Sequence, residues 1–286
     1  MRNVLASSTI RHLARPGQWL RVLAIVVALG AIAYGDQITV FWDDFQTQEV
    51  GTDPAAPPIG EAWRIDEIAA NGIDIGNPLE LPAENVLNFG QYRNTATAAI
   101  PALGQQAMAA AGNATVRFDY FGHSNNGYSQ YFDVGGYNPL GEPAFFLRFM
   151  PQVNVGQGSR HDVMYRDPAV VGLVDTGLDI SSGTSQPVSI TADFAAGSYQ
   201  LGIAGNTVTL PMFACGEAIV DVQFSNYAAA IGSGPAKVSG YLDNVAISVT
   251  TPDQQSGAKP AVPELASIWL LVTGAATLLG IWLLRK

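Results

Sequence analysis

The stretch VSITADFAAGSYQLGIAGNTVTL, from Val188 to Leu210, contains three short runs separated by turn residues. The runs Val188–Phe194, Ser198–Ala204 and Thr207–Leu210 are rich in β-branched and aromatic residues, which favour strands. Ala195-Ala196-Gly197 and Gly205-Asn206 join them, and loops this short with a glycine are typical of hairpins. The stretch therefore predicts three neighbouring strands in an antiparallel meander.

The same pattern continues on both sides of this meander. Gln105–Ala111 is a short run of good helix formers, and Gly122–Glu142, rich in Gly, Asn and Tyr, reads as a long loop. Short strands with frequent turns predict an all-β protein, an antiparallel two-sheet sandwich over residues 34–250. The other expected strands are Gln37–Trp42, Trp63–Asp66, Val86–Phe89, Thr95–Ile100, Ala114–Phe121, Ala144–Met150, His161–Arg166, Val170–Val174, Ala218–Phe224 and Lys237–Thr250.

Both ends of the chain differ from this domain. Residues 1–33 combine four arginines with the apolar run Val22–Ala33, which ends Ala31-Ile32-Ala33 and predicts a signal peptide cut after Ala33. Residues 251–261 are polar and read as a linker. Ser267–Leu284 has 18 uncharged residues, which as a helix would cover roughly 27 Å and cross a bilayer. We expect the basic end, Arg285-Lys286, to stay in the cytoplasm.

Charge and cysteine content narrow the classes of function. The chain of 286 residues has a net charge of −10, and most of its basic residues outside the domain lie in the leader. An acidic domain disfavours nucleic acid as a partner. The single Cys215 excludes an internal disulfide, so stability must come from a packed core.

The C-terminal segment 262–286 resembles the PEP-CTERM sorting signal of Gram-negative bacteria. The resemblance lies in Pro263-Glu264-Leu265, the apolar run and Arg285-Lys286. It implies processing by an exosortase and an association with exopolysaccharide at the cell surface or in the matrix. A plain single-pass anchor is the alternative interpretation of the same residues.

The domain resembles laminin-G or concanavalin-A-like jelly rolls. The resemblance lies in Phe41-Trp42-Asp43-Asp44-Phe45, in Tyr199–Gly205 and in Gly240–Val245. It implies that the first and last strands pair side by side. Galactose-binding-like sandwiches have a similar terminal layout and remain an alternative.

If the terminal strands pair, the sequence predicts a cation site at their ends. Their ends would bring together Asp43, Asp44, Asp243 and Asn244, and oxygen ligands of this kind hold Ca²⁺. The alternative is that these side chains cap local turns by accepting bonds from nearby backbone N–H groups. The first interpretation predicts a structural calcium ion and the second predicts none.

A ligand-binding loop is expected within Gly122–Glu142. Aromatic faces stack on sugars, and Asn or Asp side chains orient hydroxyl groups. The alternative is a surface loop whose tyrosines pack onto the sandwich. The candidate side chains are Tyr128, Tyr131, Tyr137, Asn125, Asn126 and Asp133.

Motifs for catalysis are sparse. Asp66, Glu67 and Asp74 lack the alternating spacing of jelly-roll glucanases, and no Gly-x-Ser-x-Gly motif accompanies His123 or His161. The favoured function is therefore a non-catalytic exported protein that binds or organises extracellular polysaccharide. A membrane-anchored module that binds a periplasmic protein and a divergent glycan hydrolase or lyase are the alternatives.

Overall fold

The computed structural model describes residues 37–67, 72–78, 84–89, 92–122, 130–151, 160–214, 216–228 and 240–251. All of them belong to one unit that ends at Thr251. The expected signal peptide, the linker from residue 252 and the sorting segment lie outside the described residues. The same holds for Cys215 and for Tyr128, Asn125 and Asn126 of the expected loop.

The described chain forms two antiparallel sheets, which confirms the predicted all-β class. The eight-stranded sheet has the order β13-β12-β11-β6-β15-β4-β3, and β1 pairs with β15 beside that path. Its strands are β1 (Gln37–Asp43), β3 (Ile73–Gly76), β4 (Val86–Phe89), β6 (Asn113–Gly122), β11 (Ser185–Asp193), β12 (Ser198–Ile203), β13 (Asn206–Pro211) and β15 (Gly240–Thr250).

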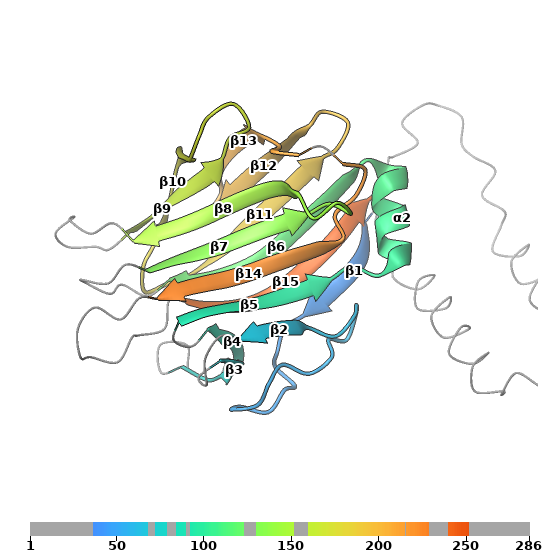
Figure 1. Cartoon of the computed structure of the whole chain (residues 1–286). Helices are drawn as coiled ribbons and strands as arrows, with labels where there is room; N and C mark the ends of the chain where they lie inside the picture. The colour runs from blue at the N-terminus through green and yellow to red at the C-terminus, as the bar shows by residue number, and fades with distance from the viewer. Residues whose placement is uncertain are drawn as a thin grey trace, which may run out of the picture. The chain divides into compact units, whose positions relative to one another are not determined.

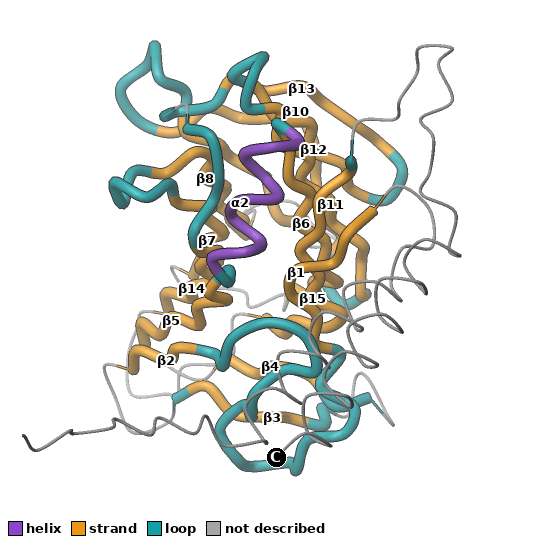
Figure 2. The backbone as a smooth tube through the Cα atoms, turned by 90° about the vertical axis from the view of Figure 1, so that its right-hand side faces the viewer, coloured by secondary structure: helices purple, strands orange, loops and turns teal. Residues whose placement is uncertain are grey.

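The seven-stranded sheet has the order β10-β9-β8-β7-β14-β5-β2. It lies in front of the other sheet in Figure 1, and the view in Figure 2 shows the two layers on either side of the core. Its strands are β2 (Arg64–Glu67), β5 (Tyr92–Ala99), β7 (Gln130–Tyr137), β8 (Pro143–Pro151), β9 (Arg160–Arg166), β10 (Leu173–Ser181) and β14 (Asp221–Ala228).

The core lies between the sheets and is filled by their inward side chains. Phe118 of β6 meets Phe224 of β14 edge to face at 5.4 Å between ring centroids, and Tyr120 packs on Phe149 of β8 at 4.9 Å. On β6 the neighbouring Arg117 and Asp119 face outward. This alternation is the period-two pattern expected of a half-buried strand.

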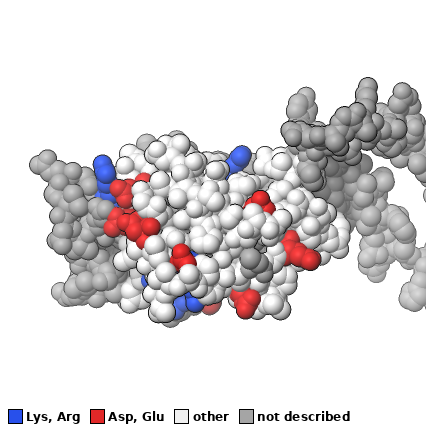
Figure 3. All heavy atoms as spheres, turned by 90° about the horizontal axis from the view of Figure 1, so that it is seen from above, with Lys and Arg blue, Asp and Glu red and all other residues white. Residues whose placement is uncertain are grey.

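One described helix, α2 (Ala102–Ala111), crosses an open end of the sandwich. It buries Met108 and ends at Gly112, whose left-handed φ of 71° lets its N–H bond to Met108 O at 2.8 Å. Among the described residues, no helix has the length and apolar character needed to cross a membrane. The surface seen in Figure 3 is mostly uncharged, with scattered acidic and basic groups.

The pairing of the first and last strands is present. β1 runs antiparallel to β15 from Gln37 opposite Thr250 to Asp43 opposite Val245. The meander β11-β12-β13 is also present, close to its predicted limits. The sequence therefore predicted correctly both the meander at one edge of the eight-stranded sheet and the pairing of its terminal strands.

Three segments differ from the expectation. The expected loop Gly122–Glu142 contains the central strand β7, and the short strand β3 was not among the expected strands. The strand expected at Val170–Val174 begins at Leu173 and continues to Ser181 as β10. β10 is an edge strand with a single buried residue, Ile180, so it lacks the apolar alternation that marks a strand.

Candidate functional site

Strand β7 presents three of the sequence-predicted ligand residues on one face. Tyr131, Asp133 and Tyr137 are partly exposed, whereas Phe132 and Val134 between them are buried in the core. A strand points alternate side chains to opposite faces, so the three residues share the outer face of the seven-stranded sheet. The structure thus brings them together on a central strand, not on the loop that we expected.

An aromatic wall stands at one end of this face. The ring of Tyr131 stacks on Tyr227 of β14, with 4.8 Å between centroids and 12° between planes. The guanidinium of Arg148, on β8, lies 3.6 Å from the centroid of the Tyr131 ring. Because β14 and β8 flank β7 on opposite sides, Tyr227 and Arg148 sandwich Tyr131. Both faces of that ring are therefore occupied, contrary to the expected role of Tyr131 as a stacking surface.

A bidentate ion pair fixes the charged part of the site. Arg148 donates from Nε and Nη2 to the two carboxylate oxygens of Asp133, each at 2.7 Å. Burial raises the pKa of Asp133, while the hydrogen bonds and charge of Arg148 and the charge of Arg93 oppose that rise. The hydrogen bond to Asp133 raises the pKa of Arg148. The pair holds the guanidinium in a fixed plane beside Tyr131.

Tyr137 provides the opposite wall. Its phenol end lies over Gly135, since a Cβ added to that glycine would be 2.9 Å from Cε2 and 3.1 Å from the hydroxyl oxygen. Burial, followed by the charges of Asp133 and Asp221, raises the pKa of Tyr137. Phe146, opposite Gly135 on β8, stands beside it. The glycine is thus the residue that makes room for this ring.

A pocket of about 160 Å³ lies among these side chains. Its floor is polar: the hydroxyl groups of Thr95 and Ser225 are 2.9 Å apart, and Gln223 is their neighbour on β14. Ligand sites commonly combine apolar walls with a few oriented polar groups, and this pocket has both. Its size suits one small polar unit, such as a single sugar ring, better than a large ligand.

The sequence reasoning found three of the twelve residues that line the pocket and missed nine. Among those missed, Phe146, Arg148 and Tyr227 lie on strands that were correctly or nearly expected, as do Arg93 and Gln223. Each of these five sits at an outward position of its strand. The detectable signal was alternation in Asp221–Tyr227, where polar residues and a tyrosine separate the buried Val222 and Phe224. Which of these strands lie side by side depends on the sheet order.

The residues expected to bind calcium divide into two groups. Asp43 is buried, and its oxygens accept bonds from Trp63 Nε1 at 2.8 Å, Phe45 N at 2.9 Å and Gln48 Nε2 at 2.9 Å. Asp44 accepts a bond from Gln46 N at 3.2 Å. These contacts are those of turn caps. The calcium site itself stays a prediction.

Asp243 and Asn244 form the second group. Asp243 lies directly opposite Asp119 of β6, and the strand bulges at Asn244, which has a φ of 52°. Asn244 donates from Nδ2 to Asp119 Oδ2 at 2.8 Å. Burial, then the charges of Glu84, Asp119 and Asp44, raises the pKa of Asp243 to about 7. Within the described parts of the chain, no group of three or more acidic, His or Cys side chains is arranged to hold a metal ion.

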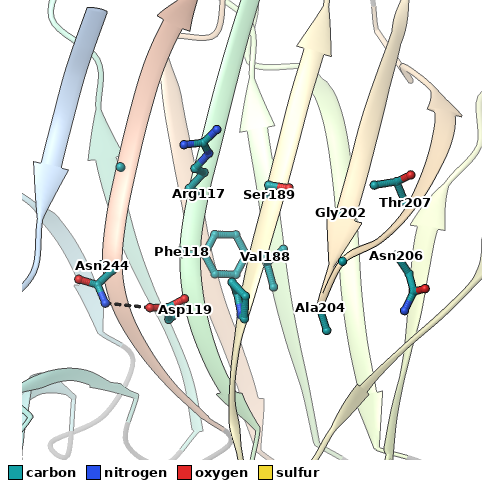
Figure 4. A pocket seen from close by; sticks show the side chains of 13 residues that line it. Arg117, Phe118, Asp119, Val188, Ser189, Gly202, Ala204, Asn206, Thr207 and Asn244 are labelled. Carbon is teal, nitrogen blue, oxygen red and sulfur yellow. Dashed lines mark hydrogen bonds between the residues drawn. The ribbon is translucent and has the colours of Figure 1, made fainter. Parts of the chain in front are cut away.

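The eight-stranded sheet carries a second hollow, of about 420 Å³, on its outer face. Figure 4 shows Arg117, Ser189, Gly202 and Thr207 on different strands of this sheet. Its other lining residues are mostly small or apolar, and its one aromatic residue, Phe118, is 1% exposed. It offers no aromatic face to a ligand, so the pocket beside Tyr137 is the stronger candidate.

The sequence matches no protein-family model and no curated protein sequence. Among solved structures, a sialidase matches with a TM-score of 0.49 and 13% identity, over 76% of this chain and 19% of the sialidase. A carbohydrate esterase from a Shiga toxin-encoding bacteriophage matches with a TM-score of 0.49 and 12% identity, over 75% of this chain and 100% of the esterase chain. Domain 4 of an arabinanase from Geobacillus stearothermophilus, in complex with arabinotriose, matches with a TM-score of 0.43 and 11% identity. The match covers 75% of this chain and 94% of the arabinanase domain. Likenesses this weak assign no activity or ligand to this chain.

Proposed function

We propose that the chain is an exported, non-catalytic protein that binds or organises extracellular polysaccharide through the pocket on the seven-stranded sheet. One observation carries the proposal: aromatic walls formed by Tyr137, Phe146 and Tyr227 enclose a polar floor that contains Asp133. Sugar rings have apolar C–H faces and many hydroxyl groups, which such walls and floors contact respectively.

The proposal extends to the fold and the location of the protein. The domain would belong to the jelly-roll class, with residues 1–33 removed on export and Ser267–Leu284 as a first anchor. An exosortase would then act on the segment that begins Pro263-Glu264-Leu265. The supporting evidence is the sequence resemblance of these segments. A structural calcium ion at Asp43, Asp44, Asp243 and Asn244 belongs to the same proposal.

The pocket favours binding over glycoside hydrolysis. Of the described residues that line it, only Asp133 carries a carboxylate, and both of its oxygens accept bonds from Arg148. Hydrolysis of a glycosidic bond ordinarily uses two carboxylates, roughly 5–10 Å apart. Asp133 instead holds the guanidinium of Arg148 in place, and an oriented guanidinium can bind a ligand.

The experiment is affinity electrophoresis of the full chain, in mild detergent, through native gels that contain a panel of soluble polysaccharides. We expect retardation by at least one polysaccharide. Tyr137→Ala should weaken that binding about tenfold, because it removes one wall of the pocket. Gln223→Ala should weaken it less, because it removes one polar contact from the floor.

The matched control is Gln200→Ala, which changes an exposed glutamine on the outer face of the other sheet. It should bind as the wild type does, and thermal melting should show all three variants folded. Absence of binding across the panel would overturn the proposal. Equal binding by Tyr137→Ala and the wild type would move the site elsewhere.

Export and processing have their own test. The intact mass of the protein is measured in the membrane and secreted fractions of cells that carry an exosortase. A mass that ends before Ser267 supports sorting to the surface, and a mass that retains Lys286 supports a plain anchor.

A further inference from the structure

The pocket continues into a longer groove across the seven-stranded sheet. Another hollow on this sheet, of about 290 Å³, is lined by Phe146, Arg148, Arg166, Gly172 and Leu173. It shares Phe146 and Arg148 with the first pocket. The two hollows are therefore neighbouring compartments on either side of these two side chains, and the groove runs across the strands from β5 toward β10.

Basic residues are concentrated on this sheet. The described residues include six arginines and no lysine, and five of the six come from strands of the seven-stranded sheet. The whole chain nevertheless carries a net charge of −10. Six aspartates lie on strands of the same sheet, so the attraction for anions depends on which of these side chains line the groove.

The lining of the groove has an excess of cations. Arg93, Arg148 and Arg166 line it, and Asp133 is the carboxylate that lines it with them. Other acidic side chains nearby have different partners. Asp221 binds Arg64 at 2.9 Å, and Asp167 accepts a bond from Tyr165 at 2.9 Å.

The arginines keep donors for a ligand. Arg148 uses Nε and Nη2 for Asp133, and its Nη1 group takes no part in that pair. Arg166 packs its guanidinium 4.0 Å from the ring centroid of Phe213, which holds the planar group on the surface. Guanidinium groups match carboxylates with two parallel hydrogen bonds. Arg93 and Arg148 both line the first pocket, although their strands, β5 and β8, are three places apart in the sheet and their backbones are separated by roughly 14 Å.

We propose that the groove binds a linear acidic polysaccharide whose sugar carboxylates lie against Arg93, Arg148 and Arg166. The inference rests on the proposed polysaccharide binding and adds the class of polymer. Tyr137 and Phe146 contact sugar rings, and the arginines select those that carry a carboxylate. Asp133 is a positioning residue that acts through Arg148.

The test compares polygalacturonate oligosaccharides with the same oligosaccharides after reduction of their carboxyl groups. Binding to the full chain is measured by calorimetry in 50 mM and 500 mM salt. We expect at least tenfold tighter binding of the acidic form in low salt, and a smaller ratio in high salt because the charges are screened. Arg93→Gln and Arg166→Gln should each weaken binding of the acidic form about tenfold and leave the reduced form unchanged.

The matched control is Arg117→Gln, which removes an exposed arginine from the opposite sheet and should change neither affinity. Equal binding of the acidic and reduced forms, with loss in Tyr137→Ala, overturns the acidic class and leaves the polysaccharide function intact. Binding of dextran sulfate as tight as that of the uronate oligosaccharides overturns carboxylate recognition. Binding of neither form of the oligosaccharide overturns the inference, and absence of binding to the whole polysaccharide panel overturns the proposed function as well.

Discussion

At the scale of single residues, two buried carboxylates affect the stability of this protein. Asp43 and Asp243 are 1% and 7% exposed, and burial is the main influence that raises the pKa of each. Their surroundings differ, because three groups donate to Asp43, whereas Asp243 accepts a bond from Asn244 N at 2.7 Å and faces another carboxylate, Asp119. Asp43 should therefore stabilise the fold, and ionised Asp243 should destabilise it.

Asp243 predicts a pH dependence of stability. Its folded-state pKa of about 7 lies above the unfolded value near 3.8, so its contribution is fully present below about pH 4 and is lost as pH rises through 7. Between pH 5 and pH 8, the free energy of unfolding should fall by about 2–3 kcal/mol from this group. Urea unfolding at several pH values measures it. Asp243→Asn should remove most of the fall, and an unchanged pH profile would contradict the assignment.

Asp43 predicts a large loss of stability on truncation. Asp43→Ala leaves the buried Trp63 N–H without its acceptor and should lower the free energy of unfolding by about 2–3 kcal/mol. The matched control is Asp44→Ala, which loses one long bond near the surface and should cost under about 1 kcal/mol.

The same two variants test calcium. If the ion binds Asp43 and Asp44 together, millimolar Ca²⁺ should raise the wild-type melting temperature, and both variants should lose that rise. If the two residues only cap turns, Ca²⁺ and a chelator should give the same melting temperature, and only Asp43→Ala should melt early.

At the scale of elements, β7 joins the core to the candidate site. Gly135 and Gly136 are adjacent, yet they face opposite sides of the sheet, so an added methyl group has opposite consequences. At Gly136 a Cβ would lie 2.4 Å from the Phe145 ring in the core, and at Gly135 it would meet Tyr137 in the pocket. Neither φ lies in the left-handed region, so backbone strain is not the reason for these glycines.

Gly136→Ala should therefore destabilise the protein by about 1–3 kcal/mol through overpacking. Gly135→Ala should displace the Tyr137 ring, weaken polysaccharide binding severalfold and change stability by less, because the ring moves toward solvent. Urea unfolding and affinity electrophoresis of both variants measure the two effects. A greater loss of stability in Gly135→Ala, or a greater loss of binding in Gly136→Ala, would contradict the assignment of Gly136 to the core and Gly135 to the pocket.

β7 also shows what the sequence did not reveal. Its two glycines resemble loop residues, although here they make room for Phe145 and Tyr137. Strands such as β6 and β11 were predictable because each carries its own apolar alternation. The Asp133–Arg148 pair was not, since it depends on β7 and β8 being neighbours in register. Local pattern thus found three of the pocket residues, and sheet order supplied the rest.

At the scale of the whole molecule, the chain closes on itself through its last described strand. β15 lies between β1 and β6 and buries Leu242, Val245, Ile247 and Val249. Gln37, at the start of β1, pairs with Thr250 across 213 residues of sequence. Because the first strand cannot pair until the last is in place, the eight-stranded sheet depends on an intact β15.

This closure predicts how much of the C-terminus can be removed. A chain that ends at Pro260 keeps all of β15, so its melting temperature should match that of the full chain within about 2 °C. A chain that ends at Val245 loses the residues that face Phe41, Trp42 and Arg117 in the two neighbouring strands, together with buried Ile247 and Val249. Two such side chains contribute about 3–6 kcal/mol, which is comparable to the whole stability of a typical domain, so this chain should not fold. Circular dichroism melting and protease resistance distinguish the two outcomes. Unfolding of the Pro260 chain would show that the domain needs its tail, and release of a folded polysaccharide-binding domain by cleavage before Ser267 would then be untenable.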